Sequence, residues 1–154
     1  MLTEAEKLRI DAVIALYETR TAASVEAMRI VQDTRGWVSD ETLSDVAEYL
    51  DLSTSHLESL ATFYSMIFRS PVGRHVIMVC DSVCCWIDGS EQLIRDIGDR
   101  LGVGLGETTG DGRFTLLPVV CLGACDQAPA MLVDWRLHGR VTADGLPSIL
   151  ALYP

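Results

Sequence analysis

The chain has 154 residues, of which 49% are hydrophobic, and carries a formal net charge of -10 at pH 7. That length and apolar content suffice for one buried core plus a small helical extension without disulfides. The negative charge repels phosphate backbones and anionic lipid headgroups, so nucleic acids and membrane surfaces are excluded as expected partners. The acidic N-terminal residues and the lack of a long uncharged apolar run predict no export signal and no membrane insertion.

Residues 1–70 have the periodicity of short amphipathic helices with recognisable ends. Thr3 and Glu6 have the spacing of a capping box. Gly36 is placed to end the second helix, because glycine accepts the left-handed conformation that closes a last turn. The expected caps of the third and fourth helices are Ser39 or Asp40 and Ser53 or Ser55. The apolar faces predicted to form the core are Ile10, Val13, Ile14 and Tyr17; Ala27, Ile30 and Val31; Leu43, Val46, Ala47 and Leu50; and Leu57, Leu60, Ala61 and Tyr64.

The helical pattern stops at the segment SPVG, residues 70–73, which predicts a domain boundary. The elements expected after it are a strand at 75–79, a helix at 90–101, a strand at 114–120, a hairpin of 130–133 with 137–141, and a closing helix with Leu146, Ile149, Leu150 and Tyr153. A right-handed crossover makes the first two strands parallel neighbours. This order predicts a mixed α/β architecture, with a helical bundle in residues 1–70 and a thioredoxin-like α/β domain in residues 71–154.

All five cysteines fall in the second predicted domain. Cys80 and Cys85 follow its first strand in VCDSVCCWIDG, and Cys121 and Cys125 follow its second in VVCLGACDQAP. Two parallel neighbouring strands deliver both pairs to the same end of the sheet. In a chain without an export signal disulfides are disfavoured, so metal binding or redox chemistry becomes the leading explanation.

Two loops with two cysteines each meet the demand of a [2Fe-2S] cluster, which takes two thiolates on each iron in an apolar surround. Small residues leave the backbone N–H groups of these loops free to approach the sulfur atoms. The small residues in question are Gly89, Gly123 and Ala124. The side chains expected to form the apolar surround are Val83, Trp86 and Leu122.

Three other interpretations of the cysteines compete with the cluster. Ordinary buried thiols are a poor explanation for paired cysteines in loops at strand ends. Structural zinc sites favour pairs about two to four residues apart, so the spacing permits zinc without favouring it. A dithiol oxidoreductase lacks its C-x2-C motif after the first strand. Spacing alone also leaves open whether Cys84 or Cys85 is a ligand, because Cys84 makes a C-x3-C pair with Cys80.

No catalytic arrangement accompanies the cysteines. The glycine-rich residues 102–112 follow a helix and precede a strand, the reverse of the order that aims a helix N-terminus at a phosphate, and are expected to be a flexible loop. His56, His75 and His138 are scattered and expected to be surface or hydrogen-bonded residues. The chain is therefore expected to carry electrons without a complete active site of its own.

The stretch ATFYSMIFRSPVGRHVIMVCDSVCCW, followed by C-x3-C inside GRFTLLPVVCLGACDQAPAM, resembles the E subunit of bacterial NADH:quinone oxidoreductase, respiratory complex I. The resemblance covers essentially the whole chain. It implies a thioredoxin-like [2Fe-2S] ferredoxin domain behind a helical bundle, with Cys80, Cys85, Cys121 and Cys125 as ligands and Cys84 outside the ligand set.

The same resemblance implies an electron-transfer subunit of a complex that oxidises NADH. Its expected partners are an NADH- and FMN-binding flavoprotein subunit and a further iron-sulfur subunit, in a peripheral arm on the cytoplasmic face of the inner membrane. Equivalent subunits serve NAD-dependent formate dehydrogenases and NAD-reducing hydrogenases, although the FYSMIFRSPVGRHVI and DGRFTLLP stretches favour the respiratory complex. A zinc-stabilised interaction module and a free-standing, homodimeric ferredoxin remain as alternatives. The acidic charge predicts a negative reduction potential.

Overall fold

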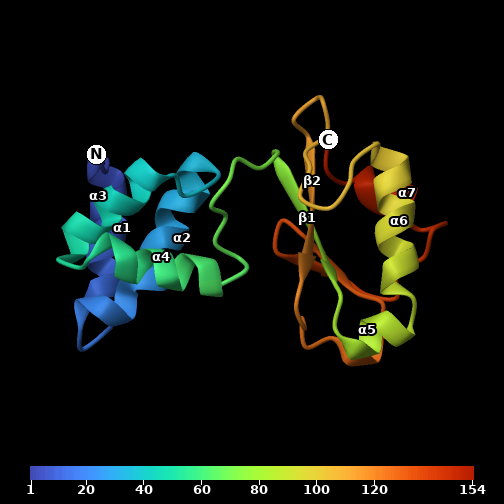
Figure 1. The fold of residues 1–154 in the computed structure, drawn as a ribbon, viewed down its shortest axis with the longest axis horizontal. Coiled ribbons are helices and arrows are strands. Elements are labelled where there is room, and N and C mark those ends of the chain that lie inside the picture. The colour runs from blue at the N-terminus through green and yellow to red at the C-terminus, as the bar shows by residue number, and fades with distance from the viewer. The chain divides into compact units, whose positions relative to one another are not determined.

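The computed structural model describes the whole chain, which divides into two compact units, Met1–Pro71 and Val72–Pro154. The first unit consists of helices, and the second combines a sheet with helices (Figure 1). The division falls beside the change of pattern expected between residues 70 and 71. No helix combines the length and the apolar character that crossing a bilayer requires.

The first unit is a bundle whose helices begin and end at the residues that local chemistry favours. Thr3 and Glu6 form the predicted capping box, in which the Glu6 carboxylate accepts the Thr3 N–H at 2.7 Å. Gly36 ends a helix with φ 84°, as expected of a left-handed closing residue. The elements are α1 (Glu4–Ile14), a 3-10 helix η1 (Arg20–Ala23), α2 (Ser24–Arg35), α3 (Asp40–Leu50) and α4 (Thr54–Phe63), of which α3 and α4 are capped by Ser39 and Ser53.

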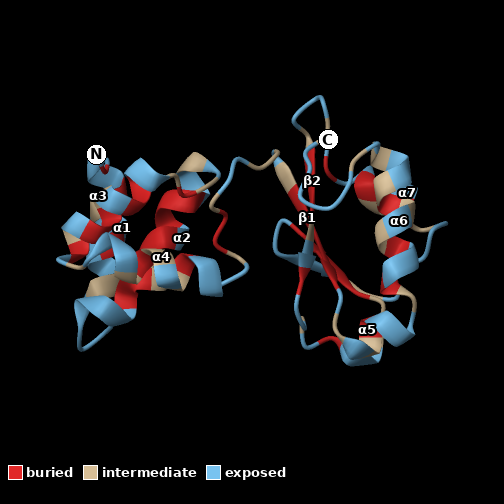
Figure 2. Cartoon of the chain, viewed as in Figure 1, coloured by how far each residue is buried: buried red, intermediate tan, exposed pale blue.

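The core of the bundle contains nearly all of the predicted apolar faces (Figure 2). Tyr17 and Tyr64 are the exceptions, because each is 43% exposed. The prediction was wrong for them because α1 ends at Ile14 and α4 at Phe63, so both tyrosines lie beyond the helix whose face they were expected to continue.

The second unit is built on a four-stranded sheet of order β2-β1-β3-β4. β1 is parallel to β2, which confirms the predicted parallel pairing, and β3 is antiparallel to both β1 and β4. The apolar faces of α6 and α7 contribute to its core, with Leu93, Ile97 and Leu146 buried. In chain order the elements are β1 (His75–Cys80), α5 (Val83–Ile87), α6 (Ser90–Leu101), β2 (Phe114–Val119), a 3-10 helix η2 (Cys125–Gln127), β3 (Met131–Val133), β4 (Arg136–His138) and α7 (Leu146–Leu150).

The glycine-rich residues 102–112 form hydrogen-bonded turns against β2 rather than the expected flexible loop. The Gly106 N–H donates to the Leu116 carbonyl at 2.7 Å, and the Leu116 N–H donates to the Glu107 carbonyl at 3.1 Å. A bridge between Thr108 and Thr115 continues this pairing. Sequence pattern misses it because glycine content reports conformational freedom, whereas the pairing is made with a strand later in the chain.

Candidate functional site

The site begins where β1 and β2 end. Cys80 is the last residue of β1 and is in register with Val119, the last residue of β2. The Asp81 N–H donates to the Val119 carbonyl at 3.0 Å, so the strands stay paired to the point where both cysteine segments begin. α5 and the chain that follows β2 lie at the same end of the sheet (Figure 1). The parallel pairing therefore brings the two segments together as expected.

The first cysteine pair is buried, with Cys80 and Cys85 each 3% exposed. Cys80 is fixed by the sheet, and its N–H donates to the Ala130 carbonyl at 3.0 Å. Cys85 lies on α5, a five-residue helix where the sequence pattern predicts a loop. Consecutive residues of a helix point about 100° apart, so Cys85 faces inward while Cys84 is only half-buried.

The helix α5 has a local signal in the sequence. Ser82 has the extended conformation typical of the residue before a helix, and Gly89 has a φ of 93°, which helps to separate α5 from α6. Ser82 and Gly89 thus lie where the start of a helix and its end are expected, on either side of VCCWI. The apolar composition of VCCWI, however, is equally typical of a short strand or a buried loop.

The second cysteine pair is exposed and is positioned by backbone turns. Gly123 has a φ of 73°, and its N–H donates to the Cys121 Sγ at 3.3 Å. Ala124 is buried, and its carbonyl accepts the Gln127 N–H at 2.9 Å to close the η2 turn, which begins at Cys125. The role predicted for small residues in this loop is thus seen at Gly123, whose N–H lies close to the Cys121 sulfur atom.

The thiols influence one another in two groups: one is Cys80, Cys84 and Cys85, and the other is Cys84, Cys121 and Cys125. Burial raises the pKa of the Cys85 thiol; the Ala130 N–H lowers it, and the neighbouring thiols of Cys80 and Cys84 raise it further. The Cys84 thiol raises the pKa of the Cys125 thiol to about 11, with a smaller contribution from Cys121. No three His, Cys, Asp or Glu side chains surround a point where one metal ion would sit. The geometry alone does not choose between Cys84 and Cys85 as a ligand.

The chemistry of these groups fits a [2Fe-2S] cluster. The donors are thiols, and they come from two segments at one end of the sheet. Backbone N–H groups of Gly123 and Ala130 approach the sulfur atoms of Cys121 and Cys85, which offsets the negative charge that thiolate ligands bring. A cluster of this kind requires both features.

The expected apolar surround is only partly present. Leu122 is half-buried, whereas Val83 and Trp86 are 62% and 56% exposed, so the prediction was wrong for these two. The reason is the orientation of α5, which turns Cys85 inward and its other apolar side chains outward. Ile87 and Val120 are 70% and 69% exposed as well.

Two of the histidines are hydrogen-bonded, as predicted. His75 Nδ1 lies 2.5 Å from Asp134 Oδ2 at the opposite end of β1 from Cys80, and His138 Nε2 lies 2.8 Å from the Tyr153 hydroxyl. His56 differs, because its Nε2 is buried without a partner.

Comparison with known proteins agrees with this chemistry. Residues 10–154 match the model of the thioredoxin-like [2Fe-2S] ferredoxin family. The chain is 51% identical over 153 residues to the E subunit of NADH-quinone oxidoreductase from Pseudomonas aeruginosa, covering 99% of this chain and 92% of the relative. It is 46% identical over 152 residues to the Escherichia coli K12 protein of the same name, with the same coverage.

Among solved structures, an NAD+-reducing [NiFe]-hydrogenase in the H2-reduced state matches 80% of this chain, with a TM-score of 0.67 and 23% identity. The match spans 21% of the hydrogenase chain, and at this identity it shows the fold alone. The chain therefore belongs to the thioredoxin-like [2Fe-2S] ferredoxin family, with a [2Fe-2S] cluster as its cofactor, and within it to the E subunits of NADH-quinone oxidoreductase.

Proposed function

We propose that this chain is the [2Fe-2S] electron-transfer subunit of the NADH-oxidising module of an NADH-quinone oxidoreductase. It exchanges electrons with the FMN of a partner flavoprotein subunit and lies beside a further iron-sulfur subunit, in an arm on the cytoplasmic face of the membrane. The observation that carries this proposal is the placement of two cysteine pairs at the adjoining ends of β1 and β2. The 51% identity to an E subunit of this complex supports the assignment.

The proposed ligands are Cys80, Cys85, Cys121 and Cys125. They are the outer cysteines of the C-x4-C motif and both cysteines of the C-x3-C motif, the set that the family resemblance implies. The bound cluster supplies one-electron transfer. The buried pair excludes water from one side of the site, and the exposed pair presents the other side to a partner. The N–H groups of Gly123 and Ala130 stabilise negative charge on the sulfur atoms.

The exposed apolar surface beside the cysteines supports the proposal of a protein partner. We name it the α5 face, and it consists of Val83, Trp86 and Ile87. Three exposed carboxylates without an ion-pair partner lie close to the cysteine segments along the chain, namely Asp81, Asp88 and Asp126. Exposed apolar groups beside charged ones are typical of docking sites, and the fitting partner surface is apolar with a basic rim. A flavoprotein bound here covers the exposed cysteines and brings its flavin toward the cluster.

The function is tested by anaerobic purification of the chain with its native partners. We expect reddish material with iron and sulfide in equal amounts, an EPR signal after reduction, and a co-purifying flavoprotein that oxidises NADH. A colourless chain that holds one zinc ion would overturn the proposal. Co-purification with a hydrogenase or formate dehydrogenase subunit would instead assign the chain to one of those complexes.

A further inference from the structure

The residues that follow β4 are hydrogen-bonded to the turn that carries Cys125. The Arg140 N–H donates to the Gln127 carbonyl at 2.6 Å, and the Val141 N–H donates to the Pro129 carbonyl at 3.1 Å. The Arg140 guanidinium adds a longer contact, from Nη2 to the Asp126 carbonyl at 3.4 Å. Residues 139–141 thus hold three backbone carbonyls of the segment that begins at Cys125.

This contact requires an unusually close approach at Gly139. A Cβ added to Gly139 would lie 2.5 Å from the Gln127 Cβ and 3.1 Å from the Gln127 carbonyl oxygen. Arg140, the next residue, has a φ of 51°, a conformation that few residues other than glycine adopt. The backbone at residues 139–140 therefore combines a close approach with a positive φ where it contacts the turn that begins at Cys125.

The 139–141 segment is anchored in the core of the second unit, whereas Cys125 is not. Val141 is 5% exposed and packs in the core of the second unit. Cys125 is exposed, so packing of its own side chain does not fix its position. Cys80 and Cys85 differ in this respect, because both are buried.

We infer that residues 139–141 are a positioning element for Cys125, which act through the Gln127 turn to hold this thiol where the cluster needs it. The inference rests on the proposed ligand set. A ligand held in place by hydrogen-bonded backbone loses less freedom on binding, and its orientation sets the electronic structure of the centre. Disturbing this contact is therefore expected to change how firmly the cluster is held and its spectroscopic signature, and to leave the fold in place.

The test compares Gly139→Val with Gly110→Val in the full chain with its cluster. Gly110 is a matched control, because it lies in the same unit and a Cβ there meets nothing within 4 Å. We expect Gly139→Val to lose its cluster to a chelator about tenfold faster than the control, since overpacking is costly in a well-packed contact. We also expect shifted EPR g-values and an altered midpoint potential, with the far-UV circular dichroism of the control.

A second-site change separates positioning from a general loss of stability. Gln127→Gly removes the Cβ that a side chain at residue 139 would meet, so in combination with Gly139→Ala it should restore the slow cluster loss and the native EPR signal. If Gly139→Val does not fold, the comparison of Gly139→Ala alone with Gly139→Ala plus Gln127→Gly still tests the inference. Cluster loss and EPR signals equal to those of Gly110→Val, or the absence of rescue, would overturn the inference. A native cluster in Cys125→Ser would instead overturn the ligand set of the proposed function.

Discussion

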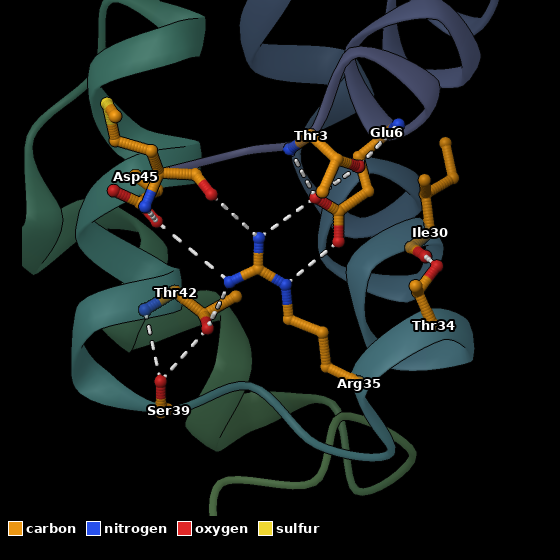
Figure 3. Close-up of polar contacts among 9 residues, drawn as sticks. Thr3, Glu6, Ile30, Thr34, Arg35, Ser39, Thr42 and Asp45 are labelled. Carbon is orange, nitrogen blue, oxygen red and sulfur yellow. Dashed lines mark hydrogen bonds and ion pairs between the residues drawn. The ribbon is translucent and has the colours of Figure 1, made fainter.

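Arg35 of α2 links three helices of the bundle, through the buried Glu6 carboxylate of α1 and the Thr42 hydroxyl of α3 (Figure 3). Its guanidinium donates from Nε and Nη2 to the two oxygens of Glu6, at 2.8 and 2.9 Å, and from Nη1 to the Thr42 hydroxyl at 3.0 Å. The Glu6 side chain is only 2% exposed. The Arg35 hydrogen bonds lower the pKa of Glu6 from 4.5 to about 2, against the opposing effect of burial. A planar, two-pronged pair of this kind is the strong form of a salt bridge.

Glu6→Gln should therefore destabilise the protein at neutral pH and weaken its acid sensitivity. The folded pKa lies below the unfolded one, so the ionised carboxylate stabilises the folded state above pH 4.5, and that stabilisation is lost as the pH falls toward 2. We expect a loss of about 2 kcal/mol at pH 7 that shrinks at acid pH, because the variant leaves a partly buried guanidinium with one partner fewer. Urea unfolding of the full chain at several pH values measures it.

The control for this prediction is Glu26→Gln. Glu26 pairs with Arg29 at 3.4 Å on the surface, where both side chains are more than 40% exposed. Such pairs contribute about 0 to 1 kcal/mol. Equal pH profiles for the two variants would contradict the role assigned to Glu6.

The proposed choice of Cys85 over Cys84 as a ligand is also tested at the residue scale. We expect Cys85→Ser to abolish the [2Fe-2S] cluster and Cys84→Ser to retain it, because the family resemblance implies Cys85 as a ligand and leaves Cys84 outside the ligand set. The burial of Cys85 beside Cys80 agrees with this expectation. Iron and sulfide content with the visible absorption spectrum measure the outcome. The reverse result would reassign the ligand to Cys84, which contacts Cys125.

At the scale of elements, α5 combines a proposed ligand, Cys85, with a proposed docking surface. Trp86→Glu should weaken binding of the proposed flavoprotein partner by about 2 kcal/mol or more, as is common when an exposed aromatic residue anchors an interface. The cluster should remain, since Trp86 is 56% exposed and does not form its buried surround. Co-purification and binding titrations measure the effect.

Leu105→Glu is the control for the α5 face. Leu105 is also an exposed apolar residue of the second unit, at 48%, but it lies in the glycine-rich turns away from the cysteines. Equal loss of partner binding in both variants would argue against a docking site on α5. If the acidic residues Asp81, Asp88 and Asp126 face a basic partner surface, rising ionic strength should weaken the native association.

At the scale of the whole molecule, the net charge of -10 acts on the potential of the cluster. Adding an electron to an anionic centre in an acidic protein is disfavoured, so we expect a negative midpoint potential. Salt screens the repulsion from surface carboxylates, so the midpoint should rise with ionic strength. A redox titration followed by EPR tests both statements, and a clearly positive midpoint at low salt would refute the first.

Much of the fold was predictable because its signals are local. The capping box of Thr3 and Glu6, the closing Gly36 and the inward face of α6 each depend on residues within a few positions of one another. The parallel pairing of β1 and β2 follows from the strand-helix-strand order, because the helix returns the chain to the end of the sheet where the first strand began. Tyr17 and Tyr64 were misplaced because periodicity does not report where a helix stops.

By itself, the sequence determined the chemistry of this protein: cysteines paired after two neighbouring strands, in a pattern typical of a [2Fe-2S] centre. Only the tertiary structure decided how those cysteines are held. It turned α5 so that Cys85 is buried while Trp86 is exposed, and it placed Gly139 against Gln127. Such arrangements depend on packing between segments far apart along the chain, for which local spacing and composition carry no signal.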